Sequence, residues 1–259
     1  MGVKDLLYRI YVARLRRQLA DAPKPAHIGV ILDGNRRWAK QVGAAASHGH
    51  RQGAANVLEF LDWADEADVQ VVTLWMLSTD NLHRSAEELA PLLEIICDAV
   101  ESIGAQRRWP VSIVGNMDLL PEWVVERLHS VEEATAQLAG RDPGEAMTVN
   151  IAVSYGGRQE IADAVRAHLE QRAAAGVSLA DAAASLTVED IAENLYTRGQ
   201  PDPDLVIRTS GEQRLSGFLL WQTVYSEYYF CEVYWPDFRH VDFLRALRDY
   251  SLRERRRGK

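Results

Sequence analysis

The sequence predicts a single α/β domain with a central, mostly parallel β-sheet that helices cover on both faces. Apolar, strand-like runs alternate with helical patterns along the chain, which favours parallel strands joined by crossover helices. No long linker or repeat interrupts this alternation, and 259 residues are an ordinary length for one α/β domain. Three of the apolar runs end in polar segments, which is where open parallel sheets bind their ligands.

The chain begins with a predicted amphipathic helix, within residues 1–22, that extends the domain formed by residues 1–259. Leucine, isoleucine and tyrosine recur at helical spacing between residues 6 and 19, and basic residues separate them. Such a helix either packs on its own domain or lies on an anionic membrane surface. Its charges break any signal-peptide core, and the sequence has no uncharged apolar run of about 18 residues.

Hydrophobic periodicity and turn residues predict the elements of the first half of the chain. In order, they are a strand at 27–32, a mobile loop at 41–53, a helix at about 54–66, a strand at 69–77, a helix at about 86–103 and a strand at 111–114. Pro121 fits the start of the next helix, because its missing N–H is not needed there.

The second half continues the same alternation. In order, we expect a strand at 147–153, a helix from 158, a short helix ending near Tyr196, a strand from 205, a strand at 228–233 and a helix at 241–257. The short helix starts at a predicted capping box, Thr187–Asp190.

The composition is that of an ordinary soluble protein, with 47 % apolar and 25 % charged residues. A net charge of −8 argues against a general nucleic-acid binder. Cys97 and Cys231 lie in apolar stretches, so we expect two reduced core residues in a cytoplasmic protein.

The polar strand ends are Asp-Gly-Asn-Arg-Arg-Trp at 33–38 and the segments 78–84 and 208–216. Parallel strands bring their carboxyl ends to one edge of the sheet, so these segments should meet. Glycine lets backbone N–H groups approach a phosphate, and the amide and arginines add oriented donors. The acid can hold a divalent metal beside those phosphates, so the pattern predicts a site for a metal-bound, phosphorylated substrate.

With these motifs the sequence resembles the cis-prenyltransferases, the family that includes undecaprenyl diphosphate synthase. The matching segments are 27–38, 78–84, 155–158, 204–216, 218–221, 225–229 and 235–238. The resemblance implies a homodimer, a parallel sheet of six strands, a hydrophobic tunnel and magnesium. It implies condensation of isopentenyl diphosphate with an allylic diphosphate to give a cis double bond. A finer similarity, to actinobacterial short-chain members that make (Z,E)-farnesyl diphosphate, rests on 197–221 and 240–250.

The resemblance also assigns roles to residues. Asp33 and Glu227 would hold the metal, although Glu227 has a surface salt bridge as its alternative interpretation. Asp33 and Asn81 would be catalytic; an amide is a poor base, so Asn81 is interpreted as an orienting group, with diphosphate or water accepting the proton. Substrate contacts are expected from Gly34, Asn35, Arg36, Arg37, Trp38, His50, Ser78, Thr79, Asp80, Leu82, Arg84, Arg208, Arg214, Leu215 and Ser216. Of these, Arg208, Arg214 and Ser216 match the isopentenyl diphosphate pocket.

Several positions depart from the family pattern. Arg36 replaces a frequent glycine. Ala46 replaces an arginine and Leu82 a tryptophan, and these two changes affect the choice of allylic substrate rather than the reaction. Met76 falls at a tunnel position that is small in long-chain members. Strand alternation would put Met76 on the face of Leu74, opposite Trp75 and Leu77, where it would stop chain growth at farnesyl length. Its alternative role is core packing.

The expected function is therefore a cytoplasmic synthase that condenses isopentenyl diphosphate with geranyl diphosphate to give (2Z,6E)-farnesyl diphosphate, with peripheral contact at the inner face of the plasma membrane left open. The alternatives are a longer-chain (decaprenyl or undecaprenyl) synthase, a non-catalytic partner subunit of the same fold and a phosphate-ester hydrolase. Partner subunits lack the Asp-Gly-Asn motif, and a hydrolase would need a general base that does not stand out. The sequence has no dinucleotide-binding glycine loop, P-loop or aspartate-rich DDxxD motif.

Overall fold

A parallel sheet of six strands organises the protein in a computed structural model that describes residues 2–139 and 146–253. The strands are β1 (His27–Ile31), β2 (Val71–Trp75), β3 (Val111–Val114), β4 (Thr148–Ala152), β5 (Leu205–Arg208) and β6 (Glu227–Phe230). Their order is β3-β4-β2-β1-β5-β6, and every pairing is parallel, which confirms the predicted fold class.

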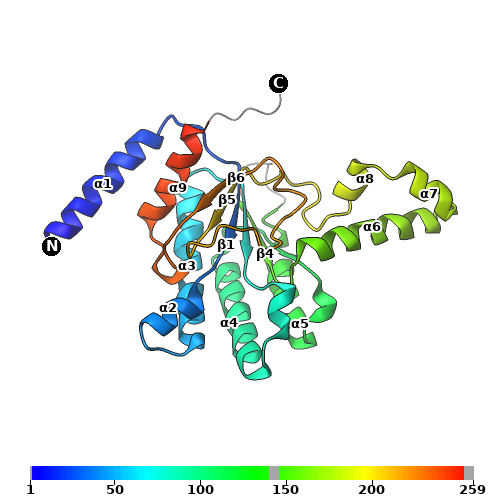
Figure 1. Cartoon of the computed structure of the whole chain (residues 1–259), viewed down its shortest axis with the longest axis horizontal. Helices are drawn as coiled ribbons and strands as arrows, with labels where there is room; N and C mark the ends of the chain where they lie inside the picture. The colour runs from blue at the N-terminus through cyan, green and yellow to red at the C-terminus, as the bar shows by residue number, and fades with distance from the viewer. Residues whose placement is uncertain (1, 140–145, 254–259) are drawn as a thin grey trace.

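Helices cover both faces of this sheet (Figure 1). They are α1 (Val3–Leu19), α2 (Asn35–Gln41), α3 (Ala46–Glu66), α4 (Ala86–Ala105), α5 (Glu122–Ala136), α6 (Gly157–Ala174), α7 (Leu179–Ser185), α8 (Val188–Ala192) and α9 (His240–Leu252), with 3₁₀ turns η1 (Thr79–His83), η2 (Met117–Leu119) and η3 (Trp235–Asp237). The predicted capping box at Thr187 is confirmed as the start of α8. The last helix ends at Leu252, and residues 254–257 of its predicted range lie outside the described residues.

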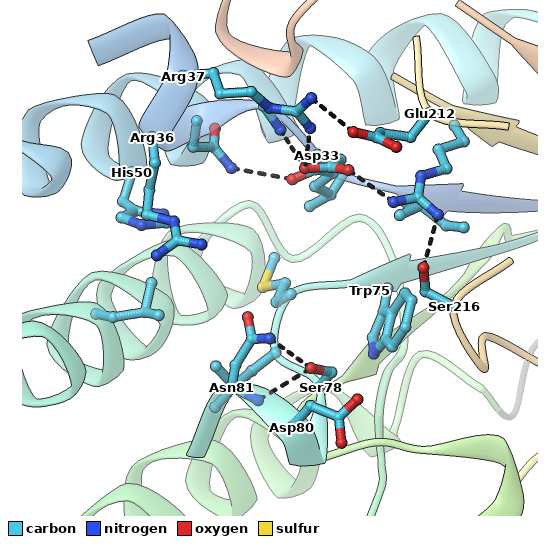
Figure 2. Close-up of a pocket in the computed structure, with 18 of the residues that line it drawn as sticks. Asp33, Arg36, Arg37, His50, Trp75, Ser78, Asp80, Asn81, Glu212 and Ser216 are labelled. Atoms are coloured by element: carbon cyan, nitrogen blue, oxygen red, sulfur yellow. Dashed lines mark hydrogen bonds and ion pairs between the residues drawn. The ribbon is translucent and has the colours of Figure 1, made fainter. Parts of the chain in front are cut away.

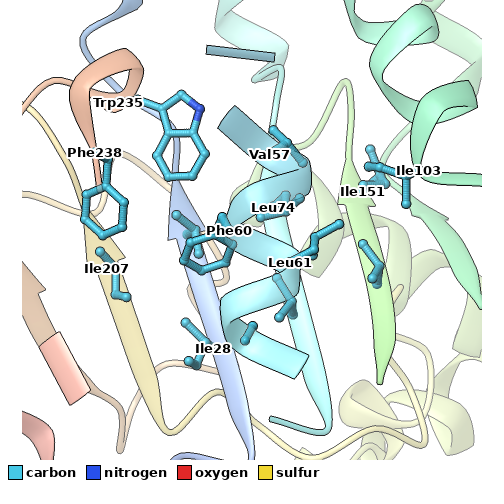
Figure 3. Close-up of a cluster of buried hydrophobic side chains, with 14 of the residues drawn as sticks. Ile28, Val57, Phe60, Leu61, Leu74, Ile103, Ile151, Ile207, Trp235 and Phe238 are labelled. Carbon is cyan, nitrogen blue, oxygen red and sulfur yellow. The ribbon is translucent and has the colours of Figure 1, made fainter. Parts of the chain in front are cut away.

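The main core lies between the sheet and the helices α3, α4, α5 and α9. Figure 3 shows Phe60 and Leu61 of α3 over the strand residues Ile28 and Leu74. A smaller cluster on the other face joins Ile31, Tyr155 and Phe218. Because both faces are covered, every residue of the central strands β1 and β5 is buried, rather than every second one. Cys97 and Cys231 are buried and free, as expected.

The predicted loop at 41–53 is wrong over its second half, because α3 already begins at Ala46. Gly49 and Gly53 are helical, and they permit close packing of α2 on α3. A Cβ atom on Gly49 would lie 2.1 Å from the backbone oxygen of Asn35, and one on Gly53 would lie 2.1 Å from its Oδ1. The glycines thus indicate close approach of two helices rather than a flexible segment.

Strand β2 is shorter than predicted and ends at Trp75. The expected alternation therefore fails at Leu77, which packs in the main core with Leu74 instead of on the face of Trp75. Met76 follows the strand and packs against the same core as Leu74, so this part of the expectation is confirmed.

Helix α1 packs on its own domain through its second half. Leu15 and Leu19 are buried in the main core, whereas Leu6, Leu7 and Ile10 are about half exposed. In the part of the chain that the structure describes, no helix has the length and apolar character needed to cross a membrane.

A polar network is buried at the amino end of the sheet. The His27 Nδ1–H donates to the carbonyl oxygen of Pro201 at 2.7 Å, and its Nε2 accepts from the Thr73 hydroxyl at 2.8 Å. Asn150 donates to the same hydroxyl at 3.0 Å. Burial lowers the pKa of His27 to about 4, so the ring is neutral near pH 7.

We expect this histidine to make the fold acid-sensitive. Its pKa falls from 6.5 in the unfolded chain to about 4 in the folded protein, so its contribution is complete above pH 6.5 and is lost as the pH falls toward 4. Between pH 7 and pH 4 the loss should be about 3 kcal/mol. Urea unfolding should show that His27→Gln reduces this pH dependence by that amount; parallel pH profiles for the two proteins would contradict the assignment.

Candidate active site

The three polar strand ends converge on one cavity of about 610 Å³ at the carboxyl edge of the sheet (Figure 2). Its lining includes Asp33, Gly34, Asn35, Arg36, Arg37, His50, Met76, Ser78, Asp80, Asn81, Arg84, Arg208, Arg214 and Ser216, all of which the sequence singled out. The parallel register explains the convergence, because Ile31, Trp75 and Arg208 stand side by side at the ends of β1, β2 and β5.

Asp33 lies at the centre of the cavity, two residues after the end of β1. Its Oδ2 accepts from the Nη2 of Arg208 at 2.8 Å, and its Oδ1 accepts from the Nη2 of Arg37 at 3.2 Å and from the N–H of Gly34 at 2.7 Å. Partial burial opposes ionisation, but the hydrogen bond and charge of Arg208 and the charge of Arg37 hold the pKa of Asp33 below its usual value. The carboxylate is therefore ionised at neutral pH.

Gly34 turns the chain from β1 into α2 with a φ of +103°, a conformation that favours glycine. A Cβ atom there would lie 2.6 Å from the ring of Tyr234, so no larger residue fits. Arg36 and Arg37 follow in the first turn of α2, on a backbone that packs tightly on α3.

Two further carboxylates bridge arginines in this region, and the sequence analysis assigned neither. Glu212 contacts Arg37 at 2.9 Å and also pairs with Arg214. Glu88 contacts Arg36 at 3.3 Å and Arg84 at 3.1 Å. Each acid pairs with one arginine far away in the chain, Arg37 or Arg36, and with one nearby, Arg214 or Arg84. Only the nearby pair is visible in the sequence, as an acid close to an arginine.

The second polar segment forms η1, capped by Ser78. The amide of Asn81 is held at both ends, since its Nδ2 donates to the Ser78 hydroxyl at 2.6 Å and its Oδ1 accepts from Arg84 at 2.6 Å. Burial and the charge of Arg84 lower the pKa of His50 to about 4, so His50 is neutral and not a cation at pH 7.

The third segment contributes a buried arginine and an exposed one. Arg208 is 4 % exposed and donates through Nη1 to the Ser216 hydroxyl at 2.9 Å and to the carbonyl oxygen of Arg214. The side chain of Arg214 is 63 % exposed. Ser216 has a φ of +53°, so its hydroxyl position depends on a strained turn.

The polar cavity continues into a narrow apolar one of about 40 Å³. Met76 and Leu92 line both cavities, and Ile95, Ile96 and Trp235 line the narrow one.

The structure does not bring every predicted residue to the cavity wall. Trp38 stacks on His48 with 5.7 Å between ring centroids. Thr79 contacts the 155–156 turn through its backbone, and Leu82 and Leu215 pack against the two apolar clusters. None of these four residues lines the cavity.

The structure does not bring Glu227 and Asp33 of one chain together, so the expected role of Glu227 as a metal ligand stays a prediction. Glu227 begins β6 and aligns through Leu205 with Ile28, at the amino end of the sheet. Five residues separate Ile28 from Asp33, or about 16 Å along a strand. The Glu227 carboxylate instead accepts from Arg253 at 2.6 Å, which is the salt bridge of the alternative interpretation.

Three buried polar atoms of the cavity lack partners among the described residues: Asn35 Oδ1, His50 Nε2 and Arg208 Nε. Such atoms are costly unless a ligand or water satisfies them. Among the described residues no three histidine, cysteine, aspartate or glutamate side chains form a metal cage. One ionised carboxylate beside a phosphate site nevertheless suits magnesium, which keeps waters and phosphate oxygens as ligands.

Fold and site together define a class: an α/β enzyme with an arginine-rich site for phosphorylated substrates that opens into an apolar constriction. A family model described as putative undecaprenyl diphosphate synthase matches residues 31–258. The chain belongs to this family and is a cis-prenyltransferase.

Named relatives agree with this family. A (2Z,6E)-farnesyl diphosphate synthase of Thermobifida fusca is 58 % identical, over 97 % of each chain. Isoprenyl transferase 1 of Streptomyces avermitilis is 56 % identical, over 99 % of this chain and 98 % of its own. The crystal structure of lavandulyl diphosphate synthase from Lavandula x intermedia, in complex with dimethylallyl diphosphate, superposes with a TM-score of 0.82 at 32 % identity, covering 91 % of this chain and 99 % of that one.

Proposed function

We propose that the protein condenses isopentenyl diphosphate with geranyl diphosphate and stops at (2Z,6E)-farnesyl diphosphate. The observation that carries the short product is that Met76 lies between two adjoining cavities, as one of the residues that line both the cavity of about 610 Å³ and the apolar one of about 40 Å³. The names of the relatives, among them (2Z,6E)-farnesyl diphosphate synthases, support the same product.

Isopentenyl diphosphate would bind in the third polar segment. Arg208 and Arg214 offer guanidinium groups, and Ser216 adds a hydroxyl next to Arg208. Arginines suit this task because their planar donors match phosphate oxygens. The buried position of Arg208 makes its charge more effective than that of an exposed side chain.

The allylic diphosphate would bind at the first polar segment, where Gly34 and Asn35 present backbone groups and Arg36 and Arg37 add charge. Asp33 would hold a magnesium ion against this diphosphate. When bound, magnesium would shield the negative charge that develops as diphosphate departs. The arginines stabilise the same charge without rearranging, because the fold already fixes their α2 backbone.

The proton lost from isopentenyl diphosphate would go to diphosphate or water. Asn81 cannot serve as the base, since its oxygen already accepts from Arg84 at 2.6 Å and an amide is a very weak base. Ser78 and Asn81 instead orient the condensing unit from the second polar segment.

The assay that tests this function uses the pure protein, magnesium, radiolabelled isopentenyl diphosphate and a panel of allylic diphosphates. The result expected is one addition to geranyl diphosphate and a C15 product after dephosphorylation and chromatography. Decaprenyl or undecaprenyl products would establish the longer-chain alternative, and absence of condensation would favour a partner subunit.

We expect Met76→Ala to lengthen the products while condensation continues. Removing the side chain joins the two cavities at the constriction, so a C15 chain could grow further. Met76 is only half-buried. Its replacement by alanine should therefore reduce the stability of the fold by about 1–2 kcal/mol, which is less than the roughly 2–5 kcal/mol typical of fully buried positions. Chromatography of dephosphorylated products measures the shift.

Met117→Ala is the matched control, because Met117 packs against the same core but lines neither cavity. Its product length should equal that of the wild type. If Met76→Ala is active and still stops at C15, another residue sets the length.

Assembly and location also belong to this proposal. A homodimer in the cytoplasm is implied by the family resemblance. Peripheral contact with an anionic membrane is supported by the exposed Leu6, Leu7 and Ile10 of α1 together with the exposed Arg9 and Arg14.

A further inference from the structure

Glu212 connects arginines from two separate walls of the cavity. Its Oε1 accepts from the Nη1 of Arg37 at 2.9 Å, and its Oε2 pairs with the Nη1 of Arg214 (Figure 2 shows the contact with Arg37). Arg37 stands on α2, after the first strand, whereas Arg214 follows β5. One carboxylate therefore spans the two segments that carry the proposed diphosphate sites.

The backbone around Glu212 is fixed. Ser210 and Gly211 have φ angles of +81° and +76°, and their N–H groups donate to the carbonyl oxygens of Val233 and Cys231 at 2.8 and 2.9 Å. A Cβ atom on Gly211 would lie 2.6 Å from the Glu232 carboxylate, so both its φ and its surroundings favour glycine here. This turn directs the next side chain toward the cavity.

Both arginines have a partner in Glu212, and Arg37 has two more, since its Nη2 donates to Ser210 at 2.8 Å and to Asp33 at 3.2 Å. Their side chains are 43 % and 63 % exposed, and long exposed side chains populate many rotamers unless something holds them. Arg37, Arg208 and Arg214 also repel one another as like charges. Arg208 differs, because it is buried and held by Asp33 and Ser216.

We propose that Glu212 is a positioning residue that holds Arg37 and Arg214 ready for diphosphate. It acts through the two guanidinium groups, whose remaining N–H groups stay available to the ligand. The gain is preorganisation: the arginines lose their rotamer freedom before the substrate arrives. The identity of the substrates rests on the proposed function, whereas the role of Glu212 requires only that the site binds a diphosphate.

Calorimetric titration with inorganic diphosphate tests this role without turnover. Glu212→Gln should weaken binding about tenfold, because the guanidinium groups lose their ionic partner. In an Arg214→Ala background, Glu212→Gln should weaken diphosphate binding by no more than about threefold, because one of the two arginines that Glu212 contacts is already absent. Glu232→Gln removes an equal charge from the adjacent exposed segment and should leave affinity within about twofold.

Steady-state kinetics give the second readout: KM for isopentenyl diphosphate should rise more than kcat falls in Glu212→Gln.

Tighter binding of inorganic diphosphate by Glu212→Gln would overturn the proposal, because the carboxylate would then compete with the ligand. Additive losses in the double variant would overturn it as well. If Glu212→Gln does not fold, Glu212→Asp keeps the charge at a shorter reach and should weaken binding. If the variants show these binding effects but the wild type does not catalyse condensation, the proposed function is refuted and the role of Glu212 is left intact.

Discussion

Asp33→Asn is expected to reduce kcat for condensation by about a thousandfold or more, which corresponds to about 4 kcal/mol of transition-state stabilisation. The change keeps the shape of the side chain but removes the charge that faces Arg37 and Arg208 and would hold magnesium. Single-turnover measurements at saturating magnesium and substrates isolate the chemical step. Asp33→Ala should be at least as severe.

Asp80→Asn is the matched control, because Asp80 lines the same cavity but is exposed. Its loss should be less than about tenfold, as expected for a charge screened by water. Near-normal turnover of a folded, metal-saturated Asp33→Asn protein would contradict the central role of Asp33.

Arg208→Ala is expected to raise KM for isopentenyl diphosphate by about a hundredfold, or about 3 kcal/mol. The buried guanidinium contacts Asp33 and Ser216, so its removal deletes a diphosphate donor and leaves Asp33 without its nearest cation. Arg208→Lys should recover little, since one ammonium cannot satisfy both partners. Steady-state kinetics with each substrate varied in turn measure the effect.

Arg214→Ala provides the comparison within the same segment. Its side chain is 63 % exposed, so we expect a smaller rise in KM, about tenfold. If both variants changed only the KM for the allylic substrate, the assignment of the two diphosphate sites would have to be reversed.

The convergence of the polar segments could be predicted because it depends on sheet topology alone. Ile31, Trp75 and Arg208 end parallel strands in neighbouring positions, so the residues after them must meet. Hydrophobic periodicity and turn residues predicted the strand Val111–Val114 at its observed bounds.

Side-chain pairing across long stretches of chain could not be predicted in this way. Glu212 and Arg37 are 175 positions apart, and nothing local distinguishes Glu212 from a solvated acid. The position of Glu227 could not be predicted for a related reason. The aromatic run around it predicts a strand, but only the observed register shows which end of the sheet it occupies.

The glycines of the segment 41–53 are compatible with two structures, a loop and a closely packed helix. Glycine weakens a helix, so a loop was the reasonable interpretation. The structure shows that Gly49 and Gly53 lie inside α3 because α2 needs their lack of a side chain. Tertiary contact outweighed local propensity at these positions.

This packing of α2 on α3 bears on any attempt to engineer product length. A mutational scan should score Gly49 harshly although it carries no group that could act on a substrate, because a side chain there would push against the Asn35 backbone, two residues after Asp33. A side chain at Gly53 would meet the Asn35 amide and the ring of Trp235. A library should therefore leave both glycines unchanged. It should vary Met76, Leu92, Ile95 and Ile96, whose side chains line the narrow apolar cavity.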